Sequence, residues 1–232
     1  MTGRVVLGVS AHCDDLDFGC SGTFAKFIKA GAKAYYLILT DGSKGHDDHT
    51  IPNKTLTETR RVEQTNAGKI LGLEEVIFLD FVDGELMNTP EVRKEIVKVI
   101  RKIKPDIVLT NDPTFVYSST SINHPDHRAA GQATLDAVFP YSRNSRTWPE
   151  LIEEGLHMHK VSEVFLNNRE NADFFIDISE TIEQKLDALA CHKSQHEDSQ
   201  VLKTRVRERA AALGKPHKFK YAEGFVRIII GS

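Results

Sequence analysis

The sequence predicts an α/β fold with a Rossmann-like, mainly parallel sheet flanked by helices, and two observations carry this prediction. Short apolar runs rich in β-branched residues recur along the chain, and a helix-favouring stretch follows each of them. Strands that alternate with helices in this way are typical of a parallel sheet. The runs lie at residues 5–9, 35–41, 76–79 and 106–110.

The helices expected between these strands are recognised by apolar spacing and by signals at their ends. Gly72 is placed to end the second helix, because glycine readily adopts the left-handed conformation found just past helix ends. Pro90 begins the third helix, where a backbone N–H is not needed, and Lys and Arg lie near its end. We expect helices at 23–28, 56–71, 90–103 and 124–139.

The rest of the chain continues the pattern less regularly. Residues 140–156 are predicted to be irregular and are the only plausible seam between domains. Because no linker or repeat interrupts the sequence elsewhere, we expect one domain over 1–232. Strands are expected at 161–166, 174–178 and 225–230, and helices at 180–193 and 198–213.

Composition excludes several classes of protein. The 232 residues carry 30 basic and 33 acidic side chains, a formal net charge of −3, which is not the footprint of a protein that binds nucleic acid or an anionic membrane. No run approaches the roughly 20 apolar residues of a membrane span. The first strand begins close to the first residue, so we expect no signal peptide. The three cysteines, an odd number, favour a reducing, cytoplasmic setting.

Residues with chemical potential follow two of the predicted strands. The segment 12–15, His-Cys-Asp-Asp, comes after the first, and the segment 124–127, His-Pro-Asp-His, after the fourth. Both lie at the carboxyl edge of a parallel sheet, where they can converge. Two imidazoles and a carboxylate suit a divalent transition metal, zinc most simply, with a fourth position left for water. A neighbouring carboxylate can accept a proton from that water, so the clusters predict a hydrolytic site.

The His and Asp segments and the glycines also have plainer interpretations. An isolated His-x-Asp-Asp segment is most often a solvated turn or a helix cap, and only the second cluster favours a metal. The segment 42–49 holds two His and two Asp, but a polar loop at the rim of the site is preferred over a second metal site. The glycines do not form GxGxxG, so a dinucleotide cofactor is not expected.

The two clusters also carry a family resemblance. Residues 11–23, AHCDDLDFGCSGT, resemble the AHPDDxE segment of the PIG-L/LmbE-like deacetylases, and residues 123–131, NHPDHRAAG, resemble their HPDH segment. That family includes the sugar deacetylases of mycothiol and bacillithiol biosynthesis and the chitobiose deacetylases. TDGSKG, the Arg60–Glu63 helix, FVDGEL, HKSQ and YAEGF follow in the expected order. The resemblance spans most of the chain and implies an LmbE-like fold.

The resemblance implies a metal centre with a base beside it. By position, His12, Asp15 and His127 are similar to the family's zinc ligands. Asp14 is similar to the general base that activates the zinc-bound water. The ligand set also accepts Fe²⁺ or Co²⁺ in place of zinc.

Four further residues match positions with roles in substrate chemistry. His124 resembles the cation or general acid that stabilises the oxyanion and protonates the leaving amine, and Asp126 the residue that orients it. Arg60 and Asp83 match positions that the family uses for sugar hydroxyls.

The sequence departs from the family pattern twice. Cys13 stands where the family usually has Pro, and we interpret it as a bystander rather than a ligand. Asp17 stands where the family usually has Glu and is one methylene shorter, so that a supporting contact is lost or remade. His192, in HKSQ, is expected near the site without an assigned role.

The resemblance implies a zinc-dependent N-deacetylase that acts on GlcNAc or a GlcNAc conjugate and releases acetate. The expected partner is a small N-acetylated sugar, with no nucleic acid and no membrane, and homo-oligomers occur in the family. Two alternatives stay open: a hydrolase of the same fold that cleaves another amide or ester bond, and a non-catalytic, metal-dependent sugar or metabolite binder. The loops at 42–55, 111–123 and 140–158 carry no readable code for what is attached to the sugar.

Overall fold

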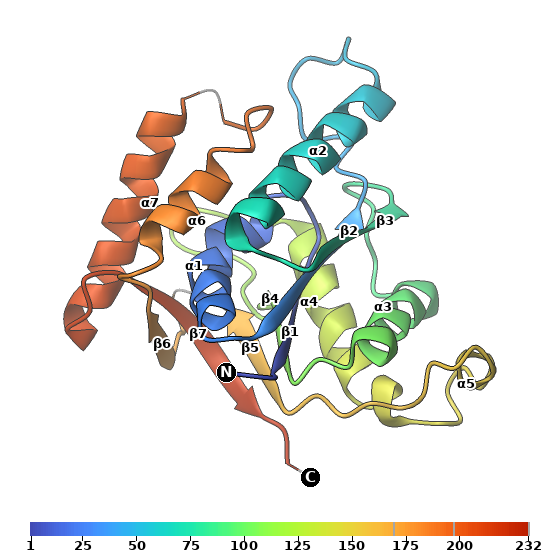
Figure 1. Ribbon diagram of the computed structural model, residues 1–232. Coiled ribbons are helices and arrows are strands. Elements are labelled where there is room, and N and C mark those ends of the chain that lie inside the picture. The colour runs from blue at the N-terminus through green and yellow to red at the C-terminus, as the bar shows by residue number, and fades with distance from the viewer. Residues whose placement is uncertain (169, 197, 232) are drawn as a thin grey trace.

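Residues 1–168, 170–196 and 198–231 are described by the computed structural model, which shows a seven-stranded sheet (Figure 1). Its order is β3-β2-β1-β4-β5-β7-β6. The first five strands pair in parallel, whereas β7 runs antiparallel to both of its neighbours. The strands are β1 (Val5–Ser10), β2 (Lys33–Thr40), β3 (Glu75–Phe81), β4 (Ile107–Asn111), β5 (Glu163–Asn167), β6 (Phe174–Asp177) and β7 (Ala222–Ile229).

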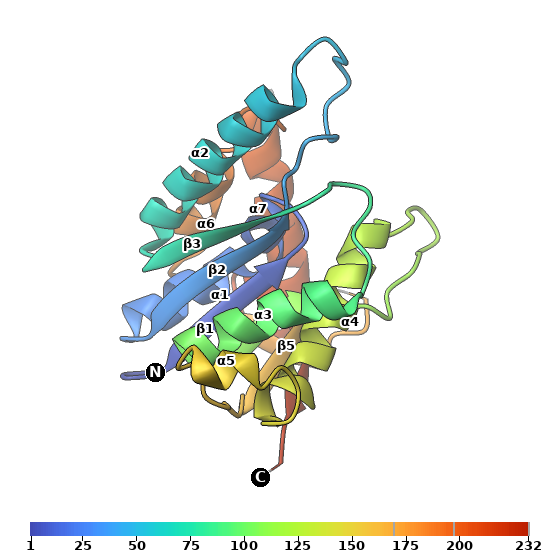
Figure 2. The same cartoon turned by 90° about the vertical axis from the view of Figure 1, so that its right-hand side faces the viewer.

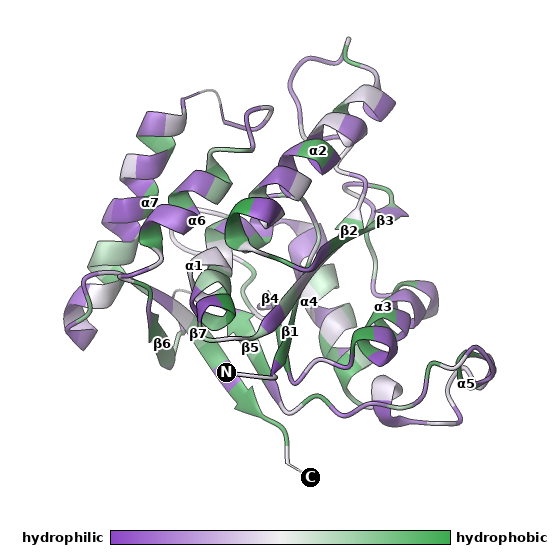
Figure 3. Cartoon of the chain, in the orientation of Figure 1, coloured by the Kyte–Doolittle hydropathy of each residue, from purple (hydrophilic) through white to green (hydrophobic). Residues whose placement is uncertain are grey.

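Helices cover both faces of the sheet (Figure 2). One layer contains α1 (Asp15–Lys29), α2 (Asn53–Leu71), α6 (Ile182–Leu189) and α7 (Ser199–Gly214). The other contains α3 (Pro90–Ile103), α4 (Pro125–Val138) and the short α5 (Glu150–Glu153). Each layer encloses its own apolar core, and the strands between them are largely hydrophobic while the outer helix faces are polar (Figure 3). The predicted parallel sheet with flanking helices is confirmed.

The helix predicted at 23–28 begins earlier, at Asp15, and the reason lies in its glycines. Gly19 and Gly22 both lie inside α1, where neighbouring segments approach closely. A Cβ at Gly19 would lie 2.0 Å from Nδ2 of Asn167. These glycines therefore serve close packing, and the early start places Asp15 in the first turn of a helix, where its negative charge is favoured.

Residues 140–156, predicted to be irregular, contain a 3₁₀ turn at Tyr141–Arg143 and the helix α5. Leu151 is fully buried, and Trp148 packs against the same apolar core as α3 and α4. Leu151 and Trp148 thus anchor this stretch to the core, while most of its other residues lie at the surface. In the described part of the chain, no helix is both long and apolar enough to cross a membrane.

The strand order explains where a site can form. From β1 the chain passes to β2 and β3 on one side, and β4 then pairs with β1 on the other side. Ligands of open α/β sheets bind at such a reversal, beyond the carboxyl ends of the strands. The segments that follow β1 and β4 meet there, and they carry the two clusters of His and Asp.

Candidate metal centre

The segment after β1 is held in an unusual backbone conformation. Asp14, the residue before α1, has φ of 81°, in the left-handed region. For a residue other than glycine this conformation costs of order 1–3 kcal/mol and persists only where its surroundings enforce it. The backbone N–H of His12 donates to Oδ2 of Asp15 at 2.9 Å, which closes the loop between β1 and α1. His12, Asp14 and Asp15 consequently project from one tight turn.

The segment after β4 presents its histidines at the beginning of α4. His124 caps this helix, because its Nδ1 accepts the backbone N–H of Asp126 at 3.2 Å. Pro125 occupies the first helical position, which suits its fixed φ. His127 lies one residue after Asp126, in the first turn of the helix.

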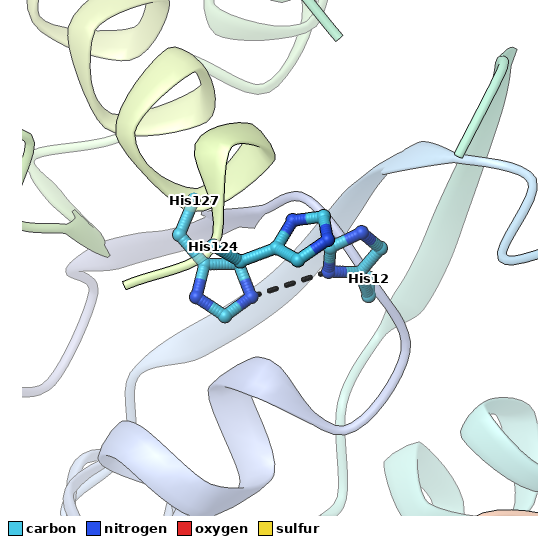
Figure 4. Close-up of side chains that lie close together, drawn as sticks. All are labelled: His12, His124 and His127. Carbon is cyan, nitrogen blue, oxygen red and sulfur yellow. Dashed lines mark hydrogen bonds between the residues drawn. The ribbon is translucent and has the colours of Figure 1, made fainter. Parts of the chain in front are cut away.

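The predicted ligand set converges. Nδ1 of His12 lies 3.2 Å from Nε2 of His127, and that Nε2 lies 3.0 Å from Oδ1 of Asp15. Nδ1 of His12 and Oδ2 of Asp15 are 3.6 Å apart. A tetrahedral zinc ion with ligand bonds of about 2.0–2.1 Å requires ligand atoms roughly 3.3 Å apart. These three side chains therefore fit a zinc ion, and Figure 4 shows the two imidazoles facing each other beside His124.

The outward nitrogens of both imidazoles lie near side-chain oxygens, although only that of His127 has a hydrogen-bond partner among the described residues. Nε2 of His12 lies 3.0 Å from Oδ1 of Asp83 and 3.4 Å from Oδ2 of Asp126. Nδ1 of His127 lies 3.1 Å from Oδ1 of Asn123. A ring proton on each outward nitrogen leaves a lone pair on the nitrogen that faces the centre, which is how metal-binding histidines are usually oriented.

Two other groupings of side chains are close enough to hold an ion: His12 with His124 and His127, and His12 with Asp83 and Asp126. Their atoms have other partners. Asp126 accepts the backbone N–H groups of Gly84 and Leu86. Asp83 accepts that of Lys44, and Nδ1 of His124 is used in the cap. The set of His12, Asp15 and His127 stays a prediction, which the distances between its ligand atoms fit.

Charges around the centre favour a cation. Burial lowers the pKa of His12, but the three carboxylates near it outweigh burial and raise its pKa to about 12. Burial raises the pKa of Asp15, yet His127 and His12 hold it well below its usual range. Asp15 is accordingly an anion, as a metal ligand must be.

Asp14 differs from Asp15. Burial raises the pKa of Asp14, against the opposing effect of His196, whose Nε2 lies 3.3 Å from Oδ2 of Asp14. A carboxylate with a raised pKa is a better proton acceptor for water than an ordinary aspartate. Asp14 borders the same cleft as the three converging ligands, and its carboxylate contacts His196.

His124 is exposed to the cleft, with its ring centroid 4.8 Å from that of His12. Burial, followed by the charge of His12, lowers its pKa. Because its Nδ1 accepts a hydrogen bond, the ring proton belongs on Nε2. These contacts favour a neutral donor, whereas the sequence prediction named a cation or general acid. The carboxylate of Asp126, predicted to orient His124, lies instead against His12 and the loop after β3.

Arg60 and Asp83, predicted to contact sugar hydroxyls, both border the cleft and both have partners within the chain. The guanidinium of Arg60 donates to the carbonyls of Gly42 and Gly45, so it shapes the 42–51 loop. Burial raises the pKa of Asp83, but the contact with His12 and the backbone N–H of Lys44 outweigh burial and lower the pKa to about 2. Their contacts with a sugar stay a prediction.

Cys13 is buried, and burial raises the pKa of its thiol far above the ordinary value. A thiol that stays protonated is a poor metal ligand, because the thiolate is the form that binds. This agrees with the interpretation of Cys13 as a bystander.

The centre opens into a cleft of about 1480 Å³. The 42–51 loop contributes Gly45, His46 and Asp47 to its rim. The opposite end is formed by α7 and the segment after β5. The side chains that border it beyond the metal centre include Phe18, Asn111, Asp112, Asn123, Asn167, Asn168, Glu170, Lys193, Gln195, His196, Arg209 and Leu213.

Sequence reasoning missed three residues that contact the centre. Asn123 holds His127, and His196 contacts Asp14. Gln64 of α2 accepts the backbone N–H of Asp14. Asn123 lies four residues before His127, a spacing that permits contact across a helix start, and this was the only local signal. His192, left without a role, is fully buried and binds Asp17.

Comparisons with known proteins give the family of this chain. Residues 7–138 match the family described as PIG-L: GlcNAc-PI de-N-acetylase. The chain is 38% identical to a diacetylchitobiose deacetylase from Thermococcus kodakarensis, over 98% of this chain and 84% of the relative. It is 27% identical to a probable N-acetyl-alpha-D-glucosaminyl L-malate deacetylase 2 from Bacillus anthracis, over 83% and 81% of the two chains.

A solved structure extends the likeness to three dimensions. The N,N'-diacetylchitobiose deacetylase from Pyrococcus horikoshii, complexed with its inhibitor MPG, matches with a TM-score of 0.89 and 30% identity. The match covers 97% of this chain and 84% of that one. The fold, the motif segments at the centre and the family match over residues 7–138 lead to one conclusion: this chain belongs to the PIG-L family of deacetylases.

Proposed function

We propose that this chain is a zinc-dependent hydrolase that removes the N-acetyl group from GlcNAc or a GlcNAc conjugate and releases acetate. One observation carries the proposal. The carboxylate of Asp14 borders the same cleft as His12, Asp15 and His127, and it contacts His196 instead of the three converging atoms. Three ligands with a separate base form the arrangement of a hydrolytic metal site.

Zinc held by His12, Asp15 and His127 would polarise the acetamide carbonyl and lower the pKa of a water toward ~7. Fe²⁺ or Co²⁺ would suit the same donors. The residues of the chain do the rest of the chemistry.

Asp14 accepts the proton of the attacking water as its oxygen bonds to the acetyl carbon. The raised pKa of Asp14 suits this step, and His196 keeps its carboxylate in place. His124 offers the Nε2 proton to the oxygen that gains negative charge in the tetrahedral state. When the C–N bond breaks, the proton that Asp14 took from the water passes to the nitrogen, which leaves as a free amine, while the acyl group leaves as acetate.

The size of the cleft supports a substrate larger than one sugar ring. Pockets for small molecules are typically about 300–1,000 Å³, whereas this cleft measures about 1480 Å³. Polar side chains, among them Asn167, Asn168 and Arg209, line part of it. These groups suit hydroxyls and ring oxygens, so we favour an N-acetylated disaccharide or a GlcNAc conjugate as substrate.

The proposal extends to the setting of the reaction. Cys13, Cys20 and Cys191 are all free thiols, which suits a reducing compartment such as the cytoplasm. A homo-oligomer is part of the same proposal by analogy with the family.

Acetate release tests the function directly. Zinc-loaded protein is incubated with GlcNAc, diacetylchitobiose and GlcNAc-malate, and acetate and phosphate are both assayed. We expect acetate from at least one substrate, abolished by a chelator and restored by zinc. Asp14→Asn is expected to keep one zinc per chain and lose about 10²–10⁴-fold in kcat. Asp187→Asn, at an exposed ion pair with Lys203 on the far helices, is the matched control and keeps wild-type turnover.

Two results would overturn the proposal. Protein that holds one zinc per chain and releases no acetate from any N-acetylated sugar is not this deacetylase. Wild-type turnover by Asp14→Asn would remove Asp14 from the role of base while leaving the reaction in place.

A further inference from the structure

Gln64 connects α2 to the turn that presents Asp14. Its side chain is fully buried, and its Oε1 accepts the backbone N–H of Asp14 at 2.9 Å. Its Nε2 donates to Oδ2 of Asp17 at 2.8 Å. Both polar atoms of this amide are therefore committed, one to the loop before α1 and one to the first turns of α1.

The carboxylate of Asp17 fixes which way the amide faces. Asp17 is fully buried, and Nε2 of His192 lies 2.7 Å from the same Oδ2 that accepts from Gln64. If the amide were flipped, an oxygen would face this carboxylate and an N–H would face the N–H of Asp14. The chain of contacts from His192 through Asp17 to Gln64 thus holds an acceptor in front of Asp14.

The backbone of Asp14 requires such a partner. Its φ of 81° is unfavourable for a residue with a side chain, so a surrounding contact must maintain it. With a negative φ at Asp14, the carboxylate would leave the turn in a direction different from the one observed. Gln64 accepts a hydrogen bond from the backbone N–H of Asp14, whereas His196 contacts the Asp14 carboxylate.

The same helix also holds the second partner of Asp14. Glu63, beside Gln64, accepts the backbone N–H of Ser194 at 2.8 Å and its hydroxyl at 2.6 Å. Ser194 lies two residues before His196. One buried face of α2 consequently fixes both the loop that carries Asp14 and the segment that carries His196; α1, α2 and α6 lie side by side in Figure 1.

We propose that Gln64 is a positioning residue for the deacetylation, acting through the backbone of Asp14. The inference rests on the proposed function, in which Asp14 accepts the proton of the attacking water. Asp17 takes part because its carboxylate accepts from the amide and so orients it.

The test is a double-mutant cycle between Gln64→Leu and Asp14→Asn, measured on zinc-loaded protein with the best substrate from the acetate assay. Gln64→Leu preserves most of the volume and removes both hydrogen bonds. We expect one zinc per chain, a KM within about threefold of wild type, and a kcat lower by about 10–100-fold. In the Asp14→Asn background, Gln64→Leu is expected to change kcat by less than threefold, because its effect passes through Asp14.

A purely structural role would give a different pattern. Ser142→Ala removes a buried hydroxyl that binds the carbonyls of Val138 and His159, away from the cleft. It is the control for lost stability, and we expect wild-type kcat despite a lowered unfolding temperature. If Gln64→Leu is insoluble, Gln64→Met replaces it, because Met is unbranched and of similar length. The same zinc content, KM and kcat are expected of it.

The outcomes separate the two proposals. Wild-type kcat in Gln64→Leu, with Asp14→Asn inactive, overturns the role of Gln64 and leaves the function intact. Equal fractional losses from Gln64→Leu in both backgrounds also overturn it. Absence of acetate release from the wild-type protein overturns the proposed function instead.

Discussion

Nδ1 of His12 and Nε2 of His127 face each other at 3.2 Å although 115 positions separate them in the sequence. The two nitrogens lie at hydrogen-bonding distance, and a metal ion held by both rings would take the place of the proton between them. The fold brings the rings together at the reversal of strand order between β1 and β4, and that is where we place the metal.

Removal of His127 tests the metal centre. We expect His127→Ala to lose bound zinc when dialysed against a weak chelator that leaves the wild-type protein with one zinc per chain. Zinc should also raise the unfolding temperature of the wild-type protein but not that of the variant, because only a folded chain presents the three ligands together. Metal analysis and thermal unfolding measure these effects.

His157→Ala is the matched control, since His157 is exposed and does not border the cleft. It is expected to bind zinc as the wild-type protein does. Full zinc occupancy in His127→Ala would contradict the ligand assignment.

Asn123 is predicted to tune the same centre without touching the metal. Its Oδ1 accepts from Nδ1 of His127, and its Nδ2 donates to the carbonyl of Phe115, which fixes its orientation. Loss of such an outer partner typically lowers metal affinity by about 10–100-fold. We expect this loss in Asn123→Ala and a smaller one in Asn123→Asp, which still accepts from the ring. Competition with a fluorescent zinc indicator measures both, and equal affinity in all three proteins would refute the role.

Much of the fold could be predicted because its signals are local. The helix expected at 90–103 has those bounds, since Thr89 caps it, Pro90 opens it and apolar residues recur along one face. The predicted start of α1 was wrong, because the helix begins at Asp15 and not at residue 23. A glycine stands at position 19 of this helix because Asn167 of β5 approaches it closely, a contact between distant parts of the chain.

The site residues also divide into those with local signals in the sequence and those that depend on tertiary contacts. His12, Asp15 and His127 lie in motif segments that follow strands, so that their convergence could be expected from the topology. Gln64 and His196 are recognisable only once α2 and the segment after α6 have been placed against α1. No spacing in the sequence indicates that pairing. Asp83 was expected to face the sugar, and its contact with His12 likewise depends on tertiary structure.

The buried pair of His192 and Asp17 predicts how stability depends on pH. Burial lowers the pKa of His192, but the hydrogen bond and charge of Asp17 outweigh it and raise the pKa. A raised folded-state pKa means that the folded chain binds the proton more tightly than the unfolded chain. The stabilisation from this pair is therefore fully present below about pH 6.5, the unfolded value, and is lost as the pH rises through the folded pKa.

We expect the difference in unfolding free energy between wild type and His192→Asn to be largest near pH 6 and to shrink toward pH 9. Urea denaturation across this pH range measures the difference, and the comparison of the two proteins cancels the contributions of the other titrating groups. A difference that stays constant or grows with pH would show that His192 is neutral in the folded protein.

The contact between Gly19 and Asn167 gives a prediction in which the sign of the effect reverses. In the wild-type background, the new methyl of Gly19→Ala meets Nδ2 of Asn167, and we expect a loss of about 1–3 kcal/mol in unfolding free energy from overpacking. In an Asn167→Ala background that obstacle is gone. The same substitution should then stabilise α1 by up to about 1 kcal/mol, because alanine is a better helix former than glycine. Urea denaturation of the four proteins measures the coupling. If Gly19→Ala has the same effect in both backgrounds, the glycine is not required by the approach of Asn167, and the early start of α1 needs another explanation.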